Sequence, residues 1–144
     1  MRALWAALTV FACAAFGLAG GPSAPATKGG KKVDARVFEL RTYYAAPGKM
    51  EALHARFREH TNKLFEKHGM TIIGFWVPTD PKEAEEKLVY ILAFPSREAA
   101  TKSWEAFRND PAWVEAKKES EKDGVLVKKV DSVFLNPTDY SPIK

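Results

Sequence analysis

The sequence predicts an α+β fold with the element order β-α-β-β-α-β, and three observations carry this prediction. Side chains that alternate between two faces over residues 37–44 are typical of a strand. Apolar residues spaced three, four and seven apart over residues 50–68 are typical of an amphipathic helix. A second β-α-β succession of patterns then follows between residues 88 and 135.

The first predicted strand has one face of unusual composition. Residues 37–44 place Glu39, Arg41 and Tyr43 in one row, because strand side chains alternate with a period of two. An acid, a base and a phenol in one row either form a solvated face or line a cavity. Phe38 belongs to the opposite face.

The first predicted helix follows a Pro-Gly turn and covers residues 50–68. Its apolar stripe consists of Met50, Leu53, Phe57 and Leu64. Gly69 marks the helix end. His60 falls at the edge of the stripe, so its side chain is predicted to point toward the sheet.

The later elements are predicted from β-branched runs, prolines and helix caps. Further strands are expected at residues 71–77, 88–94 and 125–135. Ser96 is a good N-cap for the second helix. The buried stripe of that helix contains Ala100, Trp104 and Phe107. Pro111 begins a further short helix, and residues 138–144 form a surface tail.

This order corresponds to the ferredoxin-like split β-α-β unit, a sandwich of one sheet and two helices. The helices cover one face of the sheet, yet the predicted strands carry apolar side chains on both faces. A second copy of the chain would cover the open face, so that two sheets form a dimeric α/β barrel. In that arrangement Glu39, Arg41 and Tyr43 face the inside of the barrel or its mouth.

The composition is that of one globular domain preceded by a leader. Of the 144 residues, 46% are hydrophobic and 28% are charged. Residues 1–24 have the basic start, apolar run and small residues of a secretory signal peptide, and residues 25–34 form a flexible linker. The domain is predicted at residues 35–137. The alternative, a transmembrane anchor, is disfavoured because the run is short and rich in alanine and glycine.

Export to the periplasm or the extracellular space is therefore expected, and the mature chain then has no membrane span. Cys13 is the only cysteine and lies in the leader, so the exported domain has no disulfide, thiol nucleophile or cysteine-ligated metal. The bulky Phe11 and continued apolar residues argue against lipid attachment at Cys13. The net charge of +4 is spread along the chain, which gives nucleic-acid binding no support.

Five residues are candidates for ligand binding, namely Glu39, Arg41, Tyr43, His60 and Trp76. Glu39 and Arg41 either contact a ligand or form a structural ion pair. His60 is either a satisfied core histidine or enters the same cavity, as a general acid/base or a haem ligand. The histidines are six and eight residues apart rather than four, so no metal site is predicted. No cofactor is expected, with haem as the alternative.

Short motifs are spread over nearly all of residues 35–135. They are Phe38-Glu39-Leu40-Arg41-Thr42-Tyr43, Pro47-Gly48-Lys49-Met50, His60-Thr61 with Leu64-Phe65-Glu66-Lys67-His68-Gly69, Gly74-Phe75-Trp76, and Asp110-Pro111 with Trp113. In these motifs the chain resembles the NIPSNAP family. The resemblance implies a dimeric α/β-barrel domain and no particular reaction. Animal members are linked with mitochondria and vesicles, but this chain has a leader and a single domain, so those roles are not transferred.

Three functions follow as hypotheses. The first is an exported homodimer that binds a small, largely apolar molecule in the barrel cavity. The second is an enzyme of the dimeric barrel type, a cofactor-independent or haem-dependent monooxygenase or an isomerase, in which His60 acts with the polar row. The third is a structural or scaffolding domain.

Overall fold

The computed structural model describes residues 36–144, so the predicted signal peptide (1–24) and the predicted linker (25–34) lie outside the described residues. Four strands form one antiparallel sheet in the order β2-β3-β1-β4. The strands are β1 (Val37–Ala45), β2 (Thr71–Trp76), β3 (Lys87–Phe94) and β4 (Val127–Leu135). The helices are α1 (Met50–Arg56), the π-helix η1 (Phe57–Thr61), α2 (Asn62–Lys67), α3 (Pro81–Ala84), α4 (Arg97–Asn109) and α5 (Pro111–Ser120).

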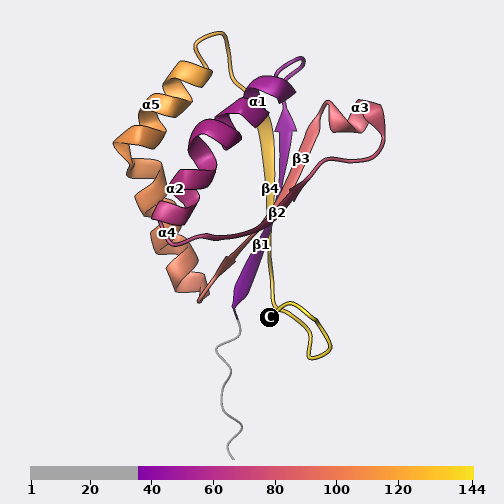
Figure 1. Cartoon of the computed structure of the whole chain (residues 1–144), viewed down its shortest axis with the longest axis vertical. Helices are drawn as coiled ribbons and strands as arrows, with labels where there is room; N and C mark the ends of the chain where they lie inside the picture. The colour runs from indigo at the N-terminus through magenta and orange to yellow at the C-terminus, as the bar shows by residue number, and fades with distance from the viewer. Residues whose placement is uncertain (1–35) are drawn as a thin grey trace, which may run out of the picture. The chain divides into compact units, whose positions relative to one another are not determined.

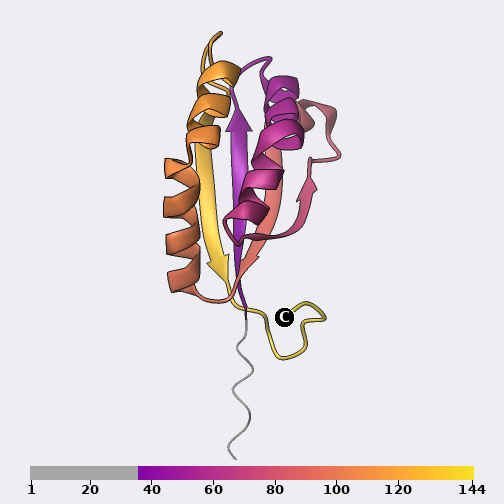
Figure 2. The same ribbon diagram turned by 60° about the vertical axis from the view of Figure 1, so that its left-hand side comes forward.

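This arrangement confirms the predicted α+β order, with the one-turn helix α3 added in the connection between β2 and β3. Figure 1 shows α1, α2, α4 and α5 on one face of the sheet, while the C-terminal tail lies near one end of the other face. Figure 2 shows the first helical arm (α1, η1 and α2) and the second helical arm (α4 and α5) lying side by side along the strands. The sheet therefore has a covered face and an open face.

The strand register assigns side chains to these two faces. Arg41 on the central strand β1 lies opposite Tyr90 on β3 and Ser132 on β4. Directly opposed residues of antiparallel strands share a face. Because the indole N–H of Trp104, on helix α4, donates to Glu39, the row that contains Glu39 and Arg41 belongs to the covered face.

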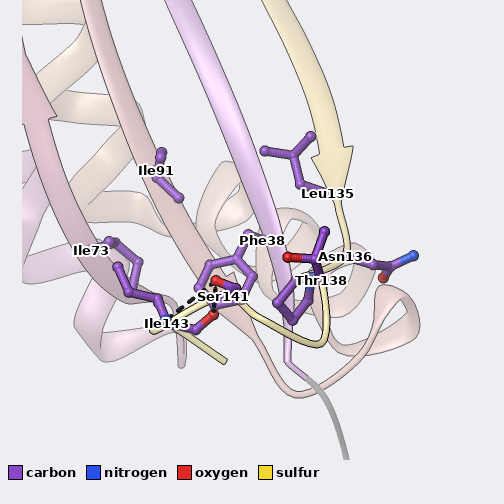
Figure 3. A pocket seen from close by; sticks show the side chains of 9 residues that line it. Phe38, Ile73, Ile91, Leu135, Asn136, Thr138, Ser141 and Ile143 are labelled. Atoms are coloured by element: carbon purple, nitrogen blue, oxygen red, sulfur yellow. Dashed lines mark hydrogen bonds between the residues drawn. The ribbon is translucent and has the colours of Figure 1, made fainter.

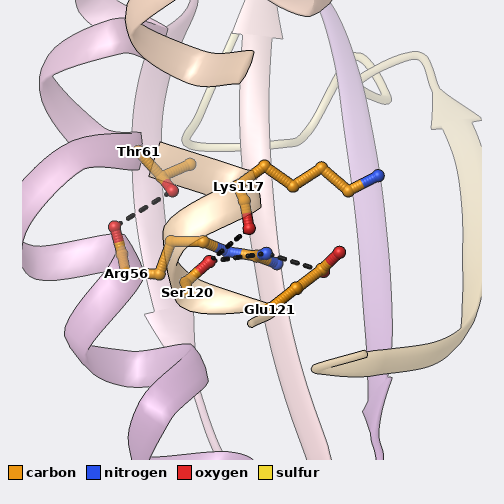
Figure 4. A network of polar contacts seen from close by, with 5 residues as sticks. All are labelled: Arg56, Thr61, Lys117, Ser120 and Glu121. Carbon is orange, nitrogen blue, oxygen red and sulfur yellow. Dashed lines mark hydrogen bonds and ion pairs between the residues drawn. The ribbon is translucent and has the colours of Figure 1, made fainter. Parts of the chain in front are cut away.

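The first helical arm contains a π-turn that the sequence pattern does not reveal. α1, η1 and α2 follow one another without a break. The hydroxyl of Thr61 donates to the carbonyl oxygen of Arg56 at 3.1 Å, across the wider turn (Figure 4). This wider turn places Thr61 rather than His60 toward the sheet, and Thr61 is only 2% exposed.

The same arm is attached to α5 through a buried arginine. The guanidinium of Arg56 donates to Glu121 Oε1 at 2.9 Å and lies within 3.4 Å of the Ser120 hydroxyl (Figure 4). It also lies over the ring of Trp113, 5.2 Å from the ring centroid. A buried charge needs such partners to compensate for lost hydration, so these contacts fix the two arms together.

The Ser96 cap, the helix start at Pro111 and the helix end at Gly69 match the prediction. The hydroxyl of Ser96 accepts a hydrogen bond from the Ala99 N–H at 3.0 Å at the start of α4. Asp110 caps α5 by accepting from the Ala112 N–H at 2.8 Å. The Asp110 carboxylate also contacts Lys67 at 2.6 Å and His68 at 2.7 Å, which ties the end of α2 to the start of α5. Gly69, with a φ of 73°, ends the first arm.

The core lies between the helices and the covered face. The predicted stripes of both helices are buried, with Met50, Leu53, Phe57, Leu64, Ala100, Trp104 and Phe107 all at 9% exposure or less. The two largest side chains with no exposure are Tyr90 and Phe65, which pack against each other with ring centroids 5.9 Å apart. Neither residue belongs to the predicted apolar stripes of the helices.

The open face presents apolar side chains to solvent on several strands. Trp76 on β2 is 49% exposed, and Val133 and Leu135 on β4 are 52% and 39% exposed. Leu40 of β1 and Ile91 of β3, which lie opposite each other, complete the apolar part and are half-buried. This face is therefore apolar yet carries no helix in the described part of the chain.

Candidate ligand-binding site

A buried carboxylate organises the covered face. Glu39 is 1% exposed and accepts three short hydrogen bonds. Its Oε1 accepts from Arg41 Nη1 and from the Ser132 hydroxyl, each at 2.6 Å, and its Oε2 accepts from the indole N–H of Trp104 at 2.6 Å. Donors from β1, β4 and α4 thus replace the water that the carboxylate loses on burial.

The prediction that Glu39, Arg41 and Tyr43 face the inside or the mouth of a barrel between two sheets is wrong. This row lies under the helices. The physical reason is that Trp104 and Ser132 supply hydrogen-bond donors to the Glu39 carboxylate on the covered face, which allows this acid to be buried there. Neither donor is near Glu39 in the sequence, so the strand pattern alone could not reveal that the polar row is the buried one.

Arg41 is held between the carboxylate and two aromatic rings. Its guanidinium lies 4.3 Å from the centroid of Trp104 and 5.6 Å from that of Tyr43. Burial alone would lower the pKa of Arg41, but Tyr90, Tyr43 and the Glu39 carboxylate outweigh it and raise the pKa. The side chain keeps 17% exposure, and its buried Nε has no hydrogen-bond partner among residues 36–144.

Tyr90 is the residue of this site that the sequence analysis missed. It is fully buried, and its hydroxyl also lacks a hydrogen-bond partner within the described part of the chain. Burial, followed by the neighbouring Tyr43, raises the pKa of Tyr90 well above its ordinary value, so the phenol is neutral at physiological pH. Tyr90 lies opposite Arg41 in the strand register, so knowledge of that pairing would have identified it as part of the site.

Tyr43 lies beside Tyr90 as an aromatic wall. The two ring centroids are 5.3 Å apart, and Phe57 of η1 packs edge-on against both rings at 5.8 and 5.5 Å. Three of the predicted residues, Glu39, Arg41 and Tyr43, are therefore together, on the covered rather than the open face.

His60 does not join them. Its side chain is 49% exposed, and its Nε2 lies 3.8 Å from the carboxylate of Glu59 on the same helix. It borders a surface groove between η1 and α5. The predicted orientation of His60 toward the sheet is wrong, because the π-turn rotates Thr61 into that place. The convergence that motivated an acid/base or haem-ligand role for His60 is thus absent.

Trp76 is also separate from the polar cluster. It ends β2, and its ring lies over Gly74 on the open face. It borders a cavity of about 260 Å³ at the β2 edge, lined in part by Phe57, Phe75 and Leu88. Trp76 therefore contributes to the edge of the sheet, while Trp104 belongs to the core, as the buried stripe of α4 predicted.

A second cavity lies on the open face. Its volume is about 300 Å³, and it is a groove between the sheet and the C-terminal tail that is open to solvent on one side (Figure 3). Phe38, Ile91 and Leu135 line it from the strands, and Ile143 lines it from the tail. Its walls are largely apolar, and its few polar groups come from the tail and the turn before it.

Residues 36–144 contain no group of three or more histidine, cysteine, aspartate or glutamate side chains placed to hold a metal ion. In the same part of the chain, no helix has the length and apolar character needed to cross a membrane.

Comparison with known proteins places the chain in one family. The NIPSNAP family model matches residues 38–142, which is most of the chain. No curated protein matches significantly. The solved structures that resemble the fold share low sequence identity with it, so they support the fold alone.

A NIPSNAP family protein of unknown function from Agrobacterium tumefaciens is 19% identical with a TM-score of 0.66, and the match covers 78% of this chain and 96% of that one. A second NIPSNAP family protein from the same organism is also 19% identical with a TM-score of 0.66, covering 76% and 99%. An uncharacterized NIPSNAP domain protein from Burkholderia xenovorans is 19% identical with a TM-score of 0.62, covering 74% and 98%. The chain therefore belongs to the NIPSNAP family.

Proposed function

We propose that this NIPSNAP domain is an exported homodimer that binds a small, largely apolar molecule between its two sheets. The observation that carries the proposal is the open face, where Trp76, Val133 and Leu135 are between 39% and 52% exposed. An apolar sheet face that stays in water is costly, and such patches commonly mark interfaces. A second copy offers a face of the same character, so the two faces would be mutually complementary.

Polar groups at one end of the open face support this packing. Lys129 and Asp131 form an ion pair at 2.9 Å, and Lys129 also lies over the ring of Tyr44. Interfaces commonly combine an apolar centre with a polar rim. In the proposed barrel these groups form the rim, and Leu40, Ile91 and Val133 form the centre.

The cavity of about 300 Å³ beside the tail is the proposed ligand site. Packing of a second sheet against the open face would close its exposed side. An apolar wall built from Phe38, Ile91 and Leu135 suits an aliphatic or aromatic molecule. The polar row does not line this cavity, so the ligand there would be held by shape and apolar contact.

The dimer is tested by two matched charge substitutions. Val133 on the open face is 52% exposed and Val114 on α5 is 53% exposed, so a glutamate at either position costs the isolated domain little. Sedimentation velocity on the wild type should show a dimer at micromolar concentration. Val133→Glu should weaken it at least tenfold, and Val114→Glu should leave it unchanged. A monomeric wild type, or equal behaviour of the two variants, contradicts the proposal.

The cavity is tested with the fluorescent probe 1-anilinonaphthalene-8-sulfonate. The wild type should enhance its fluorescence, and Ile143→Trp, which fills the cavity from the half-exposed tail, should abolish most of the enhancement. The same variant should sediment like the wild type. Absence of enhancement, or enhancement that the filled variant retains, removes this ligand site.

The enzyme hypothesis gains no observation of its own. It depended on His60 acting together with Arg41 and Tyr43, and His60 lies on the outer surface of the first helical arm.

A further inference from the structure

We propose that Arg41 and Tyr90 form a second binding site, on the covered side of the sheet, for the carbonyl oxygen of a neutral small molecule. This site is independent of the proposed dimer and of the cavity beside the tail. It is carried by two buried polar atoms, Arg41 Nε and the Tyr90 hydroxyl, whose residues lie opposite each other in the strand register. Neither atom makes a hydrogen bond of normal length among residues 36–144.

The donors are unusual because buried polar groups nearly always have partners. Tyr90 has no exposed surface, so its hydroxyl cannot reach bulk water. Arg41 uses one nitrogen, Nη1, to contact Glu39, and its Nε remains free. Leaving such groups unpaired costs free energy, which a protein recovers when a ligand supplies the missing acceptor.

The surrounding residues hold Arg41 in one orientation. Glu39 is fixed by Trp104 and Ser132, each at 2.6 Å, and it in turn fixes Nη1 of Arg41. The ring of Trp104 lies 4.3 Å from the guanidinium on one of its sides. Glu39, Trp104 and Ser132 are therefore positioning residues, and Arg41 with Tyr90 would touch the ligand.

Charge balance favours a carbonyl over a carboxylate. Glu39 already neutralises Arg41 at 2.6 Å, so the cluster carries no net charge. A ligand carboxylate would bring an uncompensated negative charge into a buried place. A ketone or amide oxygen accepts two hydrogen bonds without that cost. Tyr43 and Phe57 supply aromatic surface beside Tyr90 for the apolar body of the ligand.

Solvent reaches this site through Arg41. Its side chain keeps 17% exposure even though the carboxylate beneath it is 2% exposed. In the proposed complex the ligand approaches the guanidinium from outside, and the packed rings of Tyr43 and Phe57 shift to admit its oxygen toward Tyr90.

Three probes with the same ring system test the inference by ligand-observed NMR on the full protein. They are 2-acetonaphthone, which has a carbonyl, 2-naphthoate, which has a carboxylate, and 2-ethylnaphthalene, which has no acceptor. We expect 2-acetonaphthone to bind at least tenfold more tightly than the other two. No binding of 2-acetonaphthone, or tighter binding of the carboxylate, would overturn the proposal.

The variant Tyr90→Phe keeps the buried ring and removes only the hydroxyl. It should weaken 2-acetonaphthone binding at least tenfold and leave the thermal midpoint of the free protein unchanged or higher, because that hydroxyl has no partner to lose. Tyr140→Phe, on the tail at 85% exposure, is the matched control and should change neither quantity.

Two results would contradict this reading of Tyr90. A lower thermal midpoint of free Tyr90→Phe would show that the hydroxyl is already satisfied, for example by a buried water. Binding that Tyr90→Phe retains but Ile143→Trp removes would assign the probe to the cavity beside the tail.

Discussion

The two faces of the sheet differ in which kind of side chain they bury. On the covered face, the charged side chain of Glu39 is buried because donors from three elements converge on it. On the open face, apolar side chains such as Val133 stay in water, with 52% of the residue exposed. The polarity of the side chains along one strand therefore does not determine which face of the sheet is buried. Burial of the polar face depends on the hydrogen-bond donors that the opposing helix and the neighbouring strands supply.

The largest expected difference between the faces concerns core packing. Phe65 has no exposure and packs against Trp104 and Phe107 at centroid distances of 5.5 and 5.0 Å. We expect Phe65→Ala to lower the free energy of unfolding by about 3–5 kcal/mol, because it leaves a cavity in the core. Urea unfolding monitored by circular dichroism measures the change. Val133→Ala on the open face is the control, and similar losses at low protein concentration would contradict the contrast.

The buried carboxylate gives the next largest effect. Trp104→Phe keeps an aromatic ring but removes the indole N–H that donates to Glu39 Oε2. We expect a loss of about 1.5–3 kcal/mol, the range for hydrogen bonds to charged groups. Trp113→Phe is the matched control, because Trp113 packs against Phe107 through its ring at 4.5 Å. If the two variants lost the same stability, the donor to Glu39 would not matter.

A smaller and pH-dependent effect concerns Asp110 in the helical layer. Hydrogen bonds from Lys67, then His68 and the Ala112 N–H, hold the pKa of Asp110 well below its ordinary value of 3.8. A lowered pKa contributes stability that is present above the ordinary value and is lost as the pH falls through the folded value.

Asp110→Asn keeps the capping oxygen but cannot ionise. The stability of the wild type should therefore fall more steeply than that of Asp110→Asn as the pH decreases from about 5 to about 2. Chemical denaturation at a series of pH values measures both slopes. Parallel curves would show that the carboxylate contributes nothing through its charge.

The smallest expected effect is at Gly74 on the open face. A β-carbon there would lie 2.8 Å from the ring of Trp76, so the ring must move. Trp76 is 49% exposed and free to turn, so Gly74→Ala should change the stability of the isolated domain by less than about 0.5 kcal/mol. The tryptophan emission should shift, and the dimer should weaken. A large loss of stability at low concentration would show that Trp76 is held more firmly than its exposure indicates.

Much of the fold could be predicted because local patterns agree with it. The stripe of Met50, Leu53, Phe57 and Leu64 has helical spacing, and Ser96 caps α4 through its own hydroxyl. Such features depend on neighbours in the sequence. The short helix α3 was missed, although Asp80 accepts from two backbone N–H groups at its start and Pro81 follows, which is a recognisable cap.

The site depended on distant contacts and was predicted only in part. The acid, base and phenol of β1 do lie together, but their burial requires Trp104 and Ser132, which are 65 and 93 residues away from Glu39. Tyr90 could not be recognised without the register that places it beside Arg41. His60 was misplaced because one π-turn changes which side of a helix faces the sheet, and helical periodicity assumes a regular turn.

The most direct test of the proposed pairing of open faces is covalent footprinting at several protein concentrations. Photochemical carbene labelling followed by mass spectrometry reports the accessibility of individual side chains. As concentration rises, labelling of Trp76, Val133 and Leu135 should fall, while labelling of Val114 should stay constant. Constant labelling of all four residues, or protection of Val114 alone, would contradict the pairing of two open sheet faces.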